Sequence, residues 1–337
     1  ATQKTDANAN FSRFVENNYL DWLEGDSDAP LMSHKLLKNK VLPKVSGEKP
    51  TFLILLDNFR YDQWKAIQPL IGSLFNVQED TAYYSILPTA TNFSRNAIFS
   101  GLLPSQIKER FPDKWVNDEE KGGKNLHESD FLDDYLKRLK QPLKYNYNKI
   151  TNLEAGKSLP GKVNEFMNYD LNVIIYNFLD LMSHVRTEME VLKELAEDEA
   201  AYRSLTVSWF EHSPLYEMLK ELAQKEVNVV LTTDHGSIRV KHPSKVVGDR
   251  NTSTNLRYKQ GKSLDFEKKE VFKVSRPEQA HLPKPHVSSS FIFAKDDHYF
   301  VYPNNYNYYV NFFKNTFQHG GVSLEEMIIP VVSMTSK

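Results

Sequence analysis

The stretch TFLILLD, residues 51–57, decides the fold class of this chain. Six consecutive apolar or β-branched residues are typical of a strand that is buried on both faces, as in a parallel sheet. Two further runs of this kind follow, LNVIIYNF at residues 171–178 and VNVVLT at residues 227–232. Three such runs in one chain predict a central sheet that is mostly parallel.

Helical patterns separate the apolar runs. Apolar residues recur at helical spacing in residues 61–74 and 213–225, and residues 288–294 and 328–332 predict two further strands. Strands that alternate with helices indicate an α/β fold in which helices cover both faces of the sheet.

The N-terminal part has a different pattern. Residues 8–41 read as helical, with a break at residues 25–30, so we expect a helical linker or the end of a helical bundle over residues 1–48. Residues 49–337 then form one large domain. The first residue is Ala1 and not Met, which leads us to expect a piece of a longer protein that lacks an N-terminal partner domain.

Two segments of the large domain look like insertions. Residues 105–161 are polar and helix-rich, whereas residues 237–286 lack periodicity and hold twelve Lys and Arg against five Asp and Glu. The simpler interpretation of the basic segment is a solvated loop. The functional alternative is a flap that attracts a polyanionic substrate.

Each of the three buried runs ends in an aspartate, namely Asp57, Asp180 and Asp234. Ligand sites of open α/β sheets lie beyond the carboxyl ends of the strands. One aspartate at a strand end is commonly a turn former, but three carboxylates gathered at one edge repel each other unless cations lie between them. The pattern therefore predicts a metal site.

Histidines accompany the aspartates. His184 follows Asp180 by four residues, His235 follows Asp234 directly, and His319 opens the segment HGGVSLEEMIIP. Carboxylate and imidazole ligands without sulfur suit Zn²⁺, with Mn²⁺ or another divalent ion as a competitor. His286 precedes a predicted strand and is an alternative to His319 as a metal ligand.

A further candidate lies in ILPTATNFSRNAIFSGLLP, residues 86–104. A helix is predicted after Thr91, with Gly101 closing it and Pro104 blocking its continuation. Thr91 therefore lies where backbone N–H groups and the helix dipole favour an anion. The simpler interpretation of Thr91 is a helix N-cap.

The composition excludes several classes of protein. The chain has 337 residues, 40% apolar residues and a formal net charge of −2, which argues against a nucleic-acid coat protein. It has no cysteine, so disulfides and thiolate metal sites are excluded. No apolar run is long enough for a transmembrane helix, and we expect no membrane insertion and a cytoplasmic location.

Five motifs in order carry a resemblance to a known family: TFLILLDN, PTATNFSRNAIFSGLLP, NFLDLMSH, TTDHGS and QHGGVSLEEMIIP. Together they resemble the alkaline phosphatase superfamily, and within it the PglZ domain, over residues 49–335. Within that domain, the motifs resemble PglZ effector domains of response regulators in type IX secretion. The resemblance implies a three-layer α/β fold with a mostly parallel sheet and inserted cap segments.

The resemblance also implies a site with two zinc ions and a threonine nucleophile, which is Thr91 in this sequence. One zinc ion would be bound by Asp57, Thr91, Asp234 and His235. The other would be bound by Asp180, His184 and His319. The residues near Thr91 that are candidates for substrate binding are Asn92, Arg95 and Asn96.

The activity implied is a phosphodiesterase that acts on nucleotide, oligonucleotide or cyclic nucleotide diesters, as the output domain of a two-component response regulator. The partners implied are a missing receiver domain, a second copy of the chain on activation, and a secretion-system or sigma-factor protein. The alternative is a signalling or dimerisation module in which zinc is structural and catalysis is weak.

Overall fold

The computed structural model describes residues 2–177 and 197–337. The chain divides into two compact units, each of which is described by itself. The first unit comprises Ala1–His34, Tyr84–Phe131 and Ser237–Met327. The second comprises Lys35–Tyr83, Leu132–Gly236 and Ile328–Lys337. Both units are therefore built from segments that lie far apart in the sequence.

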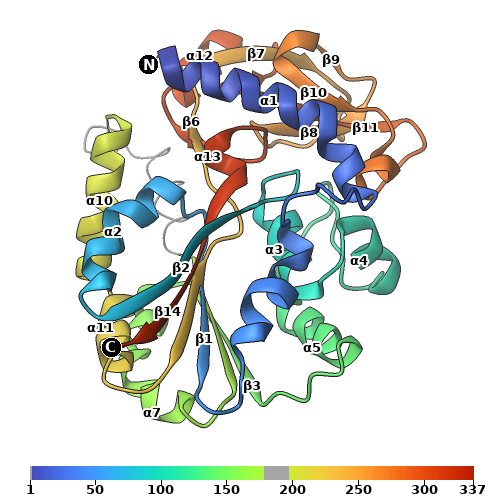
Figure 1. The fold of residues 1–337 in the computed structure, drawn as a ribbon. Coiled ribbons are helices and arrows are strands. Elements are labelled where there is room, and N and C mark those ends of the chain that lie inside the picture. Colours follow the sequence, from blue (N-terminus) through green and yellow to red (C-terminus); the bar gives the residue numbers. More distant parts are fainter. Residues whose placement is uncertain (1, 178–196) are drawn as a thin grey trace. The chain divides into compact units, whose positions relative to one another are not determined.

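The second unit contains a six-stranded sheet in the order β2-β14-β5-β1-β4-β3 (Figure 1). The strands are β1 (Thr51–Leu56), β2 (Phe75–Tyr84), β3 (Tyr145–Ile150), β4 (Leu171–Tyr176), β5 (Asn228–Thr232) and β14 (Ile328–Ser336). Strand β1 is parallel to β4 and β5, β3 is parallel to β4, and β14 is antiparallel to β5. The predicted α/β fold with a mostly parallel sheet is confirmed.

Helices of the second unit pack on the sheet through one apolar core. They are α2 (Tyr61–Gly72), α6 (Leu153–Lys157), α7 (Val163–Phe166), α10 (Glu199–Glu211) and α11 (Pro214–Leu222). Figure 1 shows α2 and α10 side by side. All six residues of β1 are buried, and alternate side chains such as Ile54 pack with Trp64 of α2 and Phe210 of α10. Burial on both faces explains why β1 has no polar interruption.

The first unit is built from helices and small sheets. Its helices are α1 (Thr2–Leu23), α3 (Thr91–Ser100), α4 (Pro104–Arg110), α12 (Tyr306–Phe313) and α13 (Leu324–Met327). Helix α5 (Glu128–Arg138) begins in this unit and ends in the other. The strands are β6 (Ile238–Arg239), β7 (His242–Val247), β8 (Tyr258–Lys262), β9 (Asp265–Phe266), β10 (Val271–Val274), β11 (Ser289–Ala294), β12 (His298–Val301) and β13 (Phe317–Gln318). They form two sheets of three strands and one of two.

Short 3₁₀ and π turns connect these elements. They are η1 (Ser33–Lys35), η2 (Leu37–Val41), η3 (Leu42–Lys44), η4 (Pro160–Lys162), η5 (Lys268–Glu270) and η6 (Pro277–Ala280). Helix α1 packs within the first unit, where Asn8 donates to Glu325 and Ser12 donates to Asp296. None of the helices that the structure describes combines the length and apolar character needed to span a bilayer. The domain boundary expected at residue 48 stays a prediction.

The basic segment 237–286 is not the irregular loop that its missing periodicity indicated. It contains five short strands, β6 to β10, and two of its cations are fully or almost fully buried, Arg257 at 0% and Lys259 at 1% exposure. The prediction of an irregular loop is therefore wrong, although eight of the twelve cations of the segment are exposed. Strands of two to six residues give too short a pattern to show a period.

The other predicted insertion, residues 105–161, supplies a strand of the central sheet. Strand β3 pairs in parallel with β4 along its whole length. Its sequence, YNYNKI, has only one buried residue, Ile150, because β3 is the last strand in the sheet order. A strand at the sheet edge lacks the apolar run that reveals β1.

Candidate metal and nucleophile site

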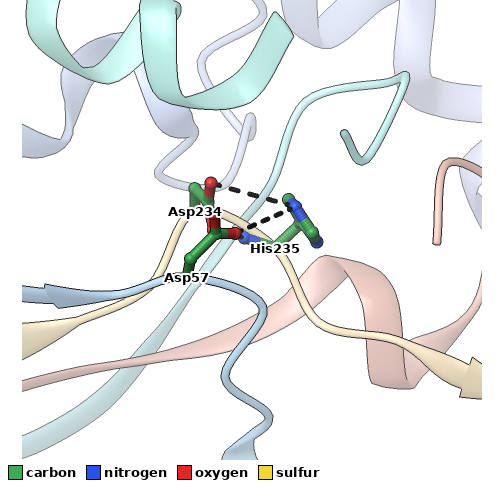
Figure 2. Close-up of side chains that lie close together, drawn as sticks. All are labelled: Asp57, Asp234 and His235. Atoms are coloured by element: carbon green, nitrogen blue, oxygen red, sulfur yellow. Dashed lines mark hydrogen bonds and ion pairs between the residues drawn. The ribbon is translucent and has the colours of Figure 1, made fainter. Parts of the chain in front are cut away.

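Asp57, Asp234 and His235 converge in the second unit (Figure 2). Within residues 2–177 and 197–337, this is the group of acidic and imidazole side chains whose ligand atoms lie close enough to hold a metal ion, all within 4.8 Å of one another. Nε2 of His235 lies 3.6 Å from Oδ1 of Asp57 and 3.8 Å from Oδ2 of Asp234. The structure thus brings together three of the residues that the sequence predicted as metal ligands, and their role as ligands stays a prediction.

The topology of the sheet brings the two aspartates together. Strands β1 and β5 are parallel neighbours, so the loops after Leu56 and Thr232 leave from the same edge of the sheet. The amide of Asp57 still donates to the carbonyl of Tyr176 on the other neighbour of β1, at 3.0 Å. Asp57 is therefore held as a continuation of its strand.

Backbone amides fix the second carboxylate. Oδ1 of Asp234 accepts from the amides of Asn58 at 3.2 Å and His235 at 3.0 Å. Asn58 has a left-handed backbone with φ of 57°, a conformation that asparagine tolerates better than most residues. The turn after β1 thus aims an N–H at the carboxylate after β5 and links the two loops.

The tautomer of His235 follows from its surroundings. Nδ1 lies 2.9 Å from the carbonyl oxygen of Gly236, and a carbonyl oxygen can only accept a hydrogen bond. Nδ1 must therefore carry the proton, and Nε2, the atom near both carboxylates, has the free electron pair in the neutral ring. A ring oriented by a backbone carbonyl is the usual arrangement of a histidine that binds a metal.

The environment of the cluster is dry and negative. Asp57, Asp234 and His235 are at most 1% exposed. The pKa of nearby Tyr83 is raised well above its usual value, first by burial and second by the charge of Asp234. Two buried carboxylates this close repel each other, and a divalent cation would offset that repulsion. Two carboxylates and one imidazole fit Zn²⁺ or Mn²⁺.

Thr91 lies in the first unit and is the first residue of α3. The N-cap of α3 is Ala90, which has no side chain to cap the helix, so the interpretation of Thr91 as the N-cap is wrong. Gly101 ends the helix with a left-handed φ of 65°, as predicted. The threonine side chain is half-buried at the end of the helix where backbone N–H groups lack partners within the helix.

His319 is also in the first unit, and the loop before Thr91 orients its ring. Nδ1 of His319 donates to the carbonyl oxygen of Thr89 at 3.0 Å, which leaves the electron pair on Nε2. The buried Thr89 hydroxyl donates to the carbonyl of Gly321 at 2.9 Å and accepts from the amide of Gly320 at 3.0 Å. The segment containing Thr91 and the segment containing His319 are therefore joined by three hydrogen bonds.

The three candidates for substrate binding have different surroundings. Arg95 is 1% exposed and its Nε donates to Glu128, also buried, at 2.6 Å. Nδ2 of Asn96 donates to the carbonyls of Asn92 and Lys124. Asn92 is half-buried and donates to Asp118 at 2.9 Å. Of the three, Asn92 retains the most access to solvent, and its role stays a prediction.

Two predicted ligands, Asp180 and His184, lie outside the described residues. His286, the alternative to His319, is exposed, and its amide donates to the hydroxyl of Ser289. The structure shows a backbone carbonyl that orients the ring for His235 and for His319. This observation favours His319 over His286 as a ligand.

Three residues around Thr91 were not found from the sequence. Nδ2 of Asn125 donates to the carbonyl of Thr91 at 3.0 Å. Asp118 accepts from both Asn92 and the hydroxyl of Tyr258, at 2.9 and 2.8 Å, and burial raises the pKa of Asp118. Asp118 and Asn125 lie in the polar segment 105–161, and Tyr258 lies in the basic segment 237–286. No motif or spacing in either segment carries a signal for this role.

The mostly parallel sheet, with paired carboxylates at the ends of adjacent strands, agrees with the alkaline-phosphatase-like fold that the sequence motifs imply. The chain belongs to the PglZ family: the BREX system PglZ alkaline phosphatase-like domain matches residues 36–334. No curated protein sequence matches the chain.

Solved structures with the same fold include human ectonucleotide pyrophosphatase/phosphodiesterase 5, at 10% identity, a TM-score of 0.53 and coverage of 85% of this chain and 87% of that one. The murine protein matches at 9% identity, a TM-score of 0.50 and coverage of 85% and 88%. An inactive threonine-to-alanine variant of the murine protein, in complex with AMP, matches with a TM-score of 0.51, 9% identity and the same coverage. At these identities the likeness concerns the fold alone.

Proposed function

We propose that the chain is a zinc-dependent phosphodiesterase that uses Thr91 as its nucleophile and acts on nucleotide or oligonucleotide diesters. The observation that carries the proposal is the convergence of Asp57, Asp234 and His235 at one edge of the sheet in a PglZ domain. The murine protein of like fold is inactive as a threonine-to-alanine variant, which supports the proposal of a threonine nucleophile. Its complex with AMP supports the proposal of a nucleotide substrate.

The proposed ligand sets follow the motifs. Asp57, Thr91, Asp234 and His235 bind one zinc ion, and Asp180, His184 and His319 bind the other. The tautomers of His235 and His319 support this proposal, because each ring keeps its electron pair on Nε2. Zinc, when bound, would lower the pKa of a coordinated oxygen and stabilise charge on the phosphoryl group.

The remaining chemistry belongs to the chain. The hydroxyl of Thr91 gives up its proton as its oxygen attacks phosphorus and a new O–P bond forms. The ester O–P bond breaks, and the leaving alkoxide takes up one proton in exchange. The phosphoryl oxygens are stabilised by the N-terminal amides of α3. Water then cleaves the phosphothreonine and regenerates the hydroxyl. Asn92, next to Thr91, is the proposed substrate contact.

The decisive experiment combines turnover with metal content. The wild-type chain loaded with zinc should hydrolyse a chromogenic phosphodiester faster than the matching monoester. Thr91→Ala should lower that rate by at least about 1000-fold while zinc remains bound. Full turnover by Thr91→Ala with its zinc retained would contradict the nucleophile assignment.

The proposed setting is the effector domain of a PorX-like response regulator of type IX secretion in the cytoplasm. The support is the order of the motifs and their residues, from TFLILLDN to QHGGVSLEEMIIP. In that setting a receiver domain precedes the chain, activation leads to a homodimer, and a secretion-system or sigma-factor protein is the partner. Light scattering of the chain fused to a phosphorylated receiver domain, with dimers expected, tests this.

One observation favours a second function, a signalling module with a structural zinc site. Arg95, the cation nearest to Thr91 in the motif, is buried in an ion pair with Glu128 instead of facing a substrate. A chain that binds zinc but turns over neither monoesters nor diesters, including cyclic dinucleotides, would support this module over the enzyme.

A further inference from the structure

The segment that carries His319 lies on a buried ion pair. Arg257 and Glu326 are both 0% exposed. Nε of Arg257 donates to Oε1 of Glu326 at 3.0 Å, and Nη2 donates to Oε2 at 2.7 Å. Arg257 precedes β8 and Glu326 belongs to α13, so the pair joins residues that are 69 positions apart.

Both partners also form hydrogen bonds with residues 321–323. Oε1 of Glu326 accepts from the amide of Gly321 at 3.1 Å, and Oε2 accepts from the hydroxyl of Ser323 at 2.5 Å. Arg257 donates to the carbonyl of Val322 at 3.4 Å and to the carbonyl of His298. The ion pair therefore holds the segment after His319 from several directions.

The segment lies directly against the guanidinium group. A methyl group added at Gly321 would be 2.9 Å from Cζ of Arg257 and 2.5 Å from the carbonyl oxygen of Ala294. On its other side, the same glycine accepts from the hydroxyl of Thr89. Gly321 thus links Glu326 to Thr89, the residue whose carbonyl orients the ring of His319.

We propose that Arg257 and Glu326 are positioning residues that fix the orientation of His319 for zinc binding. The inference rests on the proposed function, in which His319 is a zinc ligand. It explains why two charges are buried where apolar side chains would usually stabilise the fold as well or better. The carboxylate supplies two acceptors to the loop, which no apolar side chain could do.

The chain offers a matched control. Arg95 and Glu128 form a second buried arginine–glutamate pair in the first unit, with exposures of 1% and 0%, but this pair joins α3 to α5. Glu128→Gln and Glu326→Gln each leave a buried arginine without its carboxylate, so their costs to stability are comparable. Only Glu326→Gln replaces, by an NH2 donor, one of the two oxygens that accept from Gly321 and Ser323.

The test measures zinc affinities by chelator competition at a temperature where circular dichroism shows every variant folded. We expect Glu326→Gln to weaken one of two zinc sites by about 10–100-fold, the range found when a residue that orients a metal ligand is lost. His319→Ala should abolish the same site. Glu128→Gln should change neither affinity by more than about twofold. Equal effects of Glu326→Gln and Glu128→Gln would overturn the proposal.

A double variant keeps the test decisive if Glu326→Gln does not fold. Arg257→Met with Glu326→Leu replaces the buried charges by apolar groups of similar volume, which folded proteins often tolerate. It still lacks the acceptors for Gly321 and Ser323, so weakened zinc binding at the His319 site is expected. Wild-type affinity in the folded double variant would overturn the positioning role.

The same data separate the two proposals. If the wild type does not bind two zinc ions, or if His319→Ala leaves both sites intact, the zinc assignment of the proposed function is wrong and the positioning role is wrong with it. If His319→Ala removes a site but Glu326→Gln does not weaken it, only the positioning role is wrong.

Discussion

Oδ1 of Asp57 lies 3.6 Å from Nε2 of His235, and both side chains are buried. Because Nδ1 of His235 donates to the carbonyl of Gly236, the atom that meets the carboxylate is the one with the free electron pair. Two groups that attract cations therefore face one another away from water. Such an arrangement costs stability unless a cation lies between them.

Removal of metal should lower the stability of the chain. We expect a chelator to lower the melting temperature and zinc to restore it. A zinc concentration 100 times the dissociation constant would contribute about 2.7 kcal/mol to the free energy of unfolding. Scanning calorimetry of samples treated with chelator and then reloaded measures both shifts.

Asp57→Asn provides the counterpart to that experiment. The chelator-treated variant should be at least as stable as the chelator-treated wild type, because one of two repelling carboxylates is gone, but zinc should no longer raise its melting temperature. Asp133→Asn, a change at a side chain of 46% exposure in the same unit, serves as the control. An equal zinc response in Asp57→Asn and the wild type would show that Asp57 is not a ligand.

Those residues of the candidate site that directly follow a buried strand could be predicted from the sequence. The run at residues 51–56 is β1 to the residue, and Asp57 and Asp234 meet because parallel neighbours end at one edge. The sequence did not predict β2, whose ten residues include only two buried ones, since the half-exposed pattern resembles a loop. The pairing of Arg257 with Glu326 depends on tertiary contacts, and no local spacing indicates it.

Gly321→Ala should destabilise the chain by about 1–3 kcal/mol. The added methyl group would lie 2.5 Å from the backbone carbonyl oxygen of Ala294, which cannot move without shifting β11. Gly72→Ala is the matched control, because nothing lies within 4 Å of a methyl group there. It should change the free energy of unfolding, measured with urea, by less than about 0.5 kcal/mol. Similar values for both substitutions would contradict the close packing at Gly321.

Thr89→Val should cost about 1–3 kcal/mol although it hardly changes the volume of the side chain. The buried hydroxyl is the acceptor for the amide of Gly320 and the donor to the carbonyl of Gly321, and valine leaves both groups without this partner. Thr89→Ser keeps the hydroxyl and should retain most of the stability. If urea unfolding gives the same midpoint for Val and Ser at this position, these hydrogen bonds contribute little.

Lys259 should make the stability of the chain depend on pH. Its side chain is 1% exposed, with Nζ donating to the carbonyl of Ser253 at 3.0 Å and lying 4.4 Å from the centre of the Tyr302 ring. Burial lowers the pKa of Lys259 from 10.5 to about 7, and burial raises the pKa of Tyr302 to about 12, so the tyrosine stays neutral over this range.

The sign of the effect follows from proton binding. Between pH 7 and 10.5 the unfolded chain binds a proton at Lys259 that the folded chain does not, so the free energy of unfolding rises with pH, by up to about 1.4 kcal/mol per pH unit. Below pH 7 both states are protonated and the slope vanishes. The free energy of unfolding of the wild type minus that of Lys259→Met, measured with urea, should therefore be about 2 kcal/mol more positive at pH 9 than at pH 7.5. A constant difference for Lys259→Met over this range would mean that the buried amine keeps its proton.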